Sequence, residues 1–150
     1  MAKTIRYRID RVNADHYSIR NRMETTMLWT RLAAALMGAT VLIHVFAGGV
    51  DVHAPMQAAL PDPGLAAFAA VLWHAVTVVL IALTYGLWVL AKHRDLAFEI
   101  VVSGVQVGFA AVFLFYGLTR LGTVSDMPQW VIFLAIPALT RLGQSRERVL

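Results

Sequence analysis

Three histidines and one aspartate, His44, Asp51, His53 and His74, are the residues of this chain whose types and spacing most suggest chemistry. His44 and His74 lie in two separate apolar runs, and the other two residues lie between these runs. Imidazole nitrogens and a carboxylate oxygen are common ligands of zinc, copper, nickel and non-haem iron. We therefore predict that these four residues form a binding site for a divalent transition metal or another ligand.

The depth of these residues in a membrane follows from the basic residues that flank the apolar runs. A spanning helix needs about 20 apolar residues, and long basic side chains reach the membrane surface. Counting from Arg31 in the first run and from Lys92 after the second places His44 and His74 at one level, near the opposite surface. The same count places two supporting polar residues in this layer, Tyr116 and Gln129.

The histidines also have other uses that the sequence leaves open. An imidazole near the membrane surface can anchor the chain at the head groups or donate a hydrogen bond to a backbone carbonyl. A proton relay, a quinone contact or one haem between His44 and His74 is a further alternative. Haem is less favoured than a metal ion, because both histidines lie near one surface. The tryptophans are interpreted as interfacial anchors, among them Trp73 beside His74.

A second polar group is predicted at the other membrane surface, where Arg31, Glu99 and Arg141 lie at similar depth. A carboxylate between two arginines forms charge-assisted hydrogen bonds and would hold three helices together as a structural ion pair. The alternative is that each side chain reaches the interface independently. Gln106, nearer the middle of its run, is expected to form a hydrogen bond between helices.

Four apolar runs position these residues, and they cover residues 27–49, 64–91, 97–118 and 128–142. The first three are long enough to span a bilayer, whereas the fourth needs its flanking residues to do so. Gly48-Gly49 is expected to end the first helix, and Asp95 is expected to cap the third. Gly104-x-x-x-Gly108 is expected to let helices approach closely within the chain, with a homodimer seam as the alternative.

Composition and charge agree with a membrane protein. The 150 residues are 59% hydrophobic and only 15% charged, against about 25% charged residues in soluble domains. Basic residues are concentrated before the first run, between the second and third, and after the fourth, so the positive-inside rule places both termini in the cytoplasm. The fold predicted is an all-α membrane protein, a four-transmembrane-helix antiparallel bundle, with a basic cytoplasmic segment at 1–26 and a basic tail at 143–150.

Several function classes are disfavoured. The chain has no cysteine, which excludes thiolate metal sites and iron–sulfur clusters, and its basic residues follow the membrane surfaces rather than a nucleic-acid face. Its size and topology resemble those of small four-helix bacterial inner-membrane proteins that act as accessory or assembly subunits. We therefore expect a non-catalytic accessory, assembly or binding subunit, in contact with lipid and with a larger membrane complex or further copies of itself. The alternatives are a membrane redox or lipid- or quinone-handling enzyme subunit that uses the same histidines, and an oligomeric transporter or channel subunit.

Overall fold

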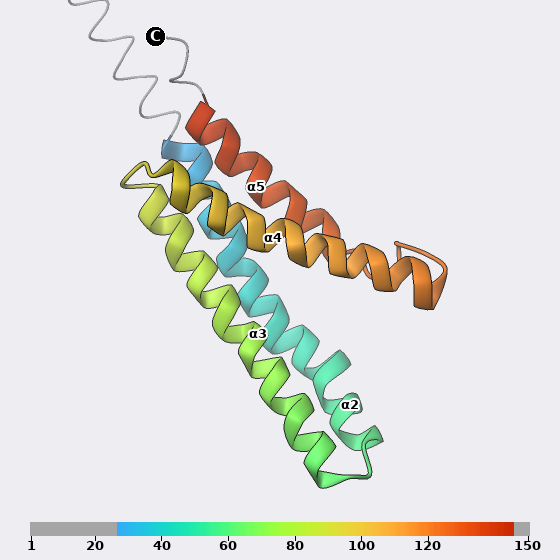
Figure 1. Ribbon diagram of the computed structural model, residues 1–150. Helices are drawn as coiled ribbons and strands as arrows, with labels where there is room; N and C mark the ends of the chain where they lie inside the picture. Colours follow the sequence, from blue (N-terminus) through green and yellow to red (C-terminus); the bar gives the residue numbers. More distant parts are fainter. Residues whose placement is uncertain (1–26, 146–150) are drawn as a thin grey trace, which may run out of the picture.

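The computed structural model describes the backbone of residues 27–145 and the side chains of residues 27–143. The predicted N-terminal segment, 1–26, and most of the predicted tail, 143–150, lie outside the described residues. Within residues 27–145 the chain forms helices joined by short connections and has no strand (Figure 1). The predicted all-helical class is therefore confirmed.

The described part of the chain contains three helices that are long and apolar enough to cross a membrane. They are a first long helix, Met27–Ala59, whose last segment is α2 (Ala54–Ala59), then α3 (Pro63–Leu90), and α4 (Leu96–Tyr116) with its continuation η3 (Gly117–Leu121). The fourth predicted span corresponds to α5 (Gln129–Ser145), which has 17 residues. At 1.5 Å per residue α5 measures about 25 Å, somewhat less than the hydrocarbon thickness of about 30 Å.

Aspartates begin two of these helices. The Asp62 carboxylate accepts a hydrogen bond from the Leu65 amide at 2.8 Å, just before α3. The Asp95 carboxylate accepts one from the Phe98 amide at 3.0 Å, as predicted for the start of α4. Each carboxylate satisfies an amide that has no partner within its own helix, which fixes where the helix begins.

The first helix does not end at Gly48-Gly49, so that prediction was wrong. The helix continues through two π-helical segments, η1 (Ile43–Ala47) and η2 (Gly49–His53), and ends only at Ala59. The role of Gly48 is to give room to a neighbour, because a Cβ atom there would lie 3.0 Å from Cη2 of Trp73 in α3. Because the helix continues to Ala59, Asp51 and His53 lie on a helix rather than in a loop.

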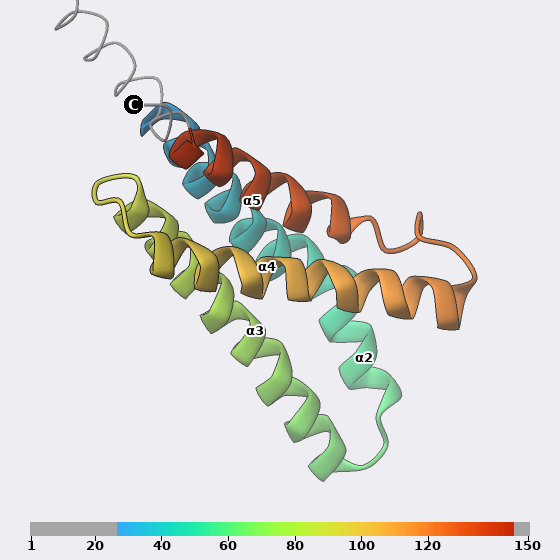
Figure 2. The ribbon, with the colours of Figure 1, turned by 45° about the horizontal axis from the view of Figure 1, so that its top comes forward.

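Within residues 27–145 the four helices form two pairs. The first helix lies beside α3, and α4 lies beside α5 (Figures 1 and 2). The pairs meet at the end of the molecule that carries the turn between α3 and α4, and they diverge toward the other end. We call the diverging part of the first pair, residues 43–59 and 63–79, the histidine arm.

The hydrophobic core lies where the pairs meet, and we call this region the packed half. Every helix contributes to it, with the residues Ala33, Ala34, Met37, Leu80, Leu83, Leu87, Leu90, Val102, Ala110, Phe133 and Ile136. The segments η1, η2 and α2 contribute no buried residue, and the buried residues of α3 begin at Leu80. The histidine arm is therefore a two-helix extension that contributes no buried residue to the core, although Val76 packs against it.

Helices approach closely at Gly86 rather than at the predicted pair Gly104 and Gly108. Gly104 and Gly108 are exposed and have nothing within 4 Å of an added Cβ, so they do not pack helices together among residues 27–143. The buried face of α4 is instead the stripe Glu99, Val102, Gln106 and Ala110. In α3, an added Cβ at Gly86 would lie 3.2 Å from both Phe98 and Val102, so this glycine lets α3 and α4 cross.

Candidate functional site

Three histidines gather around one tryptophan in the histidine arm. The His44 ring stacks on the Trp73 indole at 4.1 Å between ring centres, with 17° between the planes. The His53 ring stacks on the same indole at 5.1 Å and 22°. His74, the next residue after Trp73, meets the His53 ring edge-on at 5.7 Å and 64°. Four aromatic rings from two helices thus form one cluster.

The π-helical turns explain why His44 and His53 face the same way. The two residues are nine positions apart, which is about two and a half turns of an α-helix and would place them on opposite faces. Hydrogen bonds from i to i+5 widen the helix to about 4.4 residues per turn, so nine positions become about two turns. Gly48 lies between the histidines on this face, and the indole edge fits over it, with one imidazole on either side.

Two ring nitrogens of the cluster are buried without a hydrogen-bond partner among the described residues, Nε2 of His44 and Nδ1 of His53. A buried polar atom left without a partner costs about 1–3 kcal/mol. Native proteins therefore contain few such atoms, and those that occur frequently face a water molecule or an ion. The orphaned nitrogens mark the cluster as a place for a ligand.

The structure does not bring the four predicted ligands together. Within residues 27–145 no three His, Asp or Glu side chains are close enough to hold one metal ion. The indole separates His44 from His53, and Asp51 is exposed on η2. The remaining pair in direct contact is His53 and His74, which can offer two imidazole ligands.

The two supporting residues lie elsewhere. Tyr116 ends α4, is exposed, and packs edge-on against Phe115 at 5.3 Å. Gln129 begins α5 and is also exposed. The ends of α4 and α5 that carry them diverge from the histidine arm (Figures 1 and 2). Counting residues from the membrane surface predicts the depth of a side chain, but it does not predict which helices lie beside it at that depth.

Trp73 is the residue that sequence reasoning missed, because it was interpreted as an interfacial anchor. The signal available was its position next to His74, together with the glycines between His44 and His53. A tryptophan opposite a glycine can insert its ring between neighbouring side chains of the other helix. The π-helical geometry that makes this possible depends on contacts between the two helices rather than on a local sequence pattern.

Of the predicted group Arg31, Glu99 and Arg141, the structure pairs Glu99 with Arg141. Nη1 of Arg141 in α5 lies 3.3 Å from Oε1 of Glu99 in α4, with the Glu99 side chain 6% exposed and that of Arg141 53% exposed. Among residues 27–143, Arg31 forms no ion pair with Glu99, and it lines a small cavity together with Lys92. The amide nitrogen of Gln106 donates to the Val102 carbonyl of its own helix at 3.1 Å, so the predicted hydrogen bond between helices was wrong.

No family model, curated protein or solved structure matches this chain. The interpretation of the site therefore rests on its own geometry.

Proposed function

We propose that this chain is a small accessory or binding subunit of the bacterial inner membrane, with a transition-metal site formed by His53 and His74. In this proposal all four apolar helices cross the membrane, both termini are cytoplasmic, and the histidine arm faces the outer surface. The alternation of basic and acidic connections supports this orientation. The connection between the first helix and α3 carries Asp62 and has no Lys or Arg, whereas the turn after α3 contains Lys92 and Arg94.

The observation that carries the metal site is the contact between the His53 and His74 rings at 5.7 Å, together with the buried and unpartnered Nδ1 of His53. Imidazole is the most common protein ligand for zinc and copper. The site also lies where η2 begins to return to α-helix, and π-helical turns occur frequently at functional sites.

The remaining rings act on His53 rather than on the metal. The Trp73 indole covers one face of His53 and separates it from His44. Stacking fixes the orientation of a ligating imidazole, and such surrounding contacts tune metal affinity. Two protein ligands leave coordination positions for water or for side chains of a partner, which suits a subunit that holds a metal within a larger complex.

Metal titration of the purified full-length chain tests the proposal. We expect Cu²⁺ or Zn²⁺ to bind with one-to-one stoichiometry, and His53→Ala and His74→Ala each to abolish binding. His44→Ala should weaken binding severalfold without abolishing it, because His44 acts through the indole. His93→Ala, an exposed histidine on the turn after α3, is the matched control and should leave binding unchanged. Equal affinity in all four variants would contradict the proposal.

An optical spectrum of the same preparation separates the metal site from the redox alternative. Haem gives an intense visible absorbance, whereas Zn²⁺ bound by imidazoles gives none and Cu²⁺ bound by imidazoles gives only a weak one. A stoichiometric haem spectrum that His44→Ala or His74→Ala removes would replace the metal-site proposal with the redox-subunit one.

Reporter fusions test the topology independently of the site. We expect a reporter fused after residue 150 to be active in the cytoplasm and one fused at residue 56 to be active outside it. An external C-terminus would mean that α5 does not cross, leaving three spans.

A further inference from the structure

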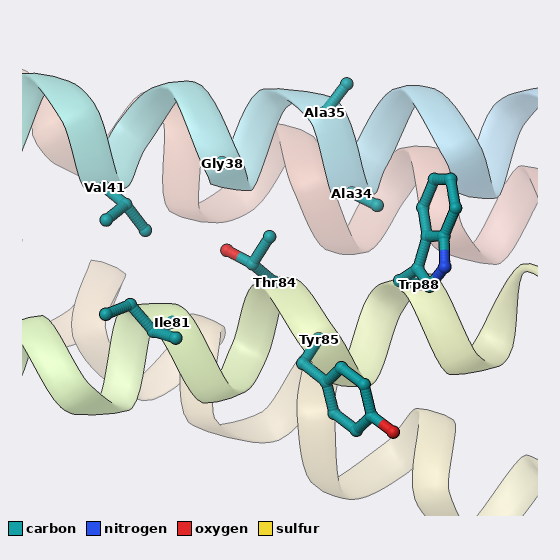
Figure 3. Close-up of a pocket in the computed structure, with 8 residues that line it drawn as sticks. All are labelled: Ala34, Ala35, Gly38, Val41, Ile81, Thr84, Tyr85 and Trp88. Carbon is teal, nitrogen blue, oxygen red and sulfur yellow. The ribbon is translucent and has the colours of Figure 1, made fainter.

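A groove separates the first helix from α3 on one side of the packed half, away from the histidine cluster. It encloses about 530 Å³ and is lined by Ala34, Ala35, Gly38, Val41, Ile81, Thr84, Tyr85 and Trp88 (Figure 3). This volume lies within the range of about 300–1,000 Å³ that is common for small-molecule sites. The lining extends over two turns of each helix, about 10 Å along the helix axis.

The wall of this groove is apolar even where the residue type is polar. The Thr84 hydroxyl donates to the Leu80 carbonyl of its own helix at 2.9 Å. Its methyl group is turned toward Gly38, where an added Cβ would lie 3.7 Å away. Figure 3 shows Thr84 pointing across the gap, whereas the Tyr85 hydroxyl points away from it. The groove therefore fits a hydrocarbon chain.

One end of the groove leads to two basic side chains. Trp88 lines the groove and also a second cavity of about 130 Å³, which it shares with Arg31, Ala91 and Lys92. The Lys92 ammonium lies 5.3 Å from the centre of the Trp88 ring, which is within cation–π range. Among residues 27–143, neither Arg31 nor Lys92 forms an ion pair with a carboxylate. Both cations are therefore available to an anion.

We propose that the groove and the basic cavity together bind one anionic phospholipid, with an acyl chain along the groove and the phosphate at Arg31 and Lys92. The order of the two parts matches a lipid in the bilayer, because the apolar part lies toward the middle of the helices and the basic part at their ends. Basic pockets between membrane helices bind anionic head groups by the same combination of charge and depth.

Native mass spectrometry of the full chain in detergent tests this proposal. Phosphatidylglycerol and phosphatidylcholine with the same acyl chains are added separately, and the retained lipid is counted. We expect one phosphatidylglycerol to be retained with a preference of roughly thirtyfold over phosphatidylcholine, falling to within about twofold in Arg31→Gln/Lys92→Gln. Arg120→Gln, a charge removed at the far end of η3, should keep the preference.

A substitution that fills the groove provides a second test of the proposal. Gly38→Leu should reduce retention of both lipids, whereas Ala39→Leu, on an exposed neighbouring position outside the groove, should not. Circular dichroism shows whether each variant is folded, and Arg31→Gln alone keeps the test available if Gly38→Leu does not fold.

Three outcomes would overturn the proposal. Equal retention of the two lipids would make the groove an ordinary lipid-facing surface. Displacement of the lipid by glycerol phosphate alone would make the basic cavity a site for a soluble phosphate. A dimer that Gly38→Leu dissociates would assign the groove to a second copy of the chain.

Discussion

The packed half and the histidine arm are built from the same kind of apolar helix, yet they differ in what holds them. In the packed half all four helices bury side chains, and one carboxylate is paired with an arginine. In the histidine arm two helices meet without a buried core, through stacked aromatic rings and a hydrogen bond from Nε2 of Gln57 to the Ala66 carbonyl at 3.1 Å. Stability is therefore expected to depend on the packed half, and ligand binding on the arm.

The largest effect is expected from a cavity in the packed half. Ile136 is fully buried, and Ile136→Ala should lower the free energy of unfolding by about 2–5 kcal/mol. Ile43 in the histidine arm is 60% exposed, so the same change there should cost less than about 0.5 kcal/mol. Unfolding in detergent followed by circular dichroism measures both. Similar losses from the two variants would mean that the arm is packed as tightly as the core.

The ion pair should respond unequally to the removal of its two members. Arg141→Gln leaves the buried Glu99 carboxylate without its partner, whereas Glu99→Gln leaves an arginine that is already half exposed. We expect Arg141→Gln to cost about 3 kcal/mol and Glu99→Gln about 1 kcal/mol, since a buried charge is more expensive to strand than an exposed one. Thermal unfolding of the two variants measures the difference. Unchanged stability in both would show that the residues reach the interface independently.

A smaller effect on stability, but a specific one on the site, is expected at Gly48. An added methyl group would lie 3.0 Å from the Trp73 ring, so Gly48→Ala should displace the indole from between the two imidazoles. Gly49→Ala has open space around it and is the matched control. We expect Gly48→Ala to weaken metal binding severalfold and to change the tryptophan fluorescence while costing less than about 1 kcal/mol. Equal metal affinity and equal tryptophan fluorescence in the two variants would show that the position of the indole does not affect the metal site.

Regularly patterned features of the fold are predictable from sequence, and features that depend on lateral contacts are not. The apolar runs and the cap at Asp95 follow from local preferences, and the structure confirms three helices of spanning length. The first helix continues past Gly48, and the ring that packs against this glycine belongs to Trp73, 25 positions later in the chain. For the same reason the sequence does not show that Tyr116 and Gln129 lie at ends of α4 and α5 that diverge from the histidine arm.

The proposed metal site consists of His53 and His74 and does not include His44. Electron paramagnetic resonance of the Cu²⁺-loaded full-length chain tests it directly, because the hyperfine pattern counts the nitrogen atoms bound to copper. We predict two imidazole nitrogens in the unmodified protein, two in His44→Ala, and no specific signal in His53→Ala or His74→Ala. A third imidazole nitrogen that disappears in His44→Ala, or a spectrum that none of the substitutions changes, would contradict a metal site formed by His53 and His74 alone.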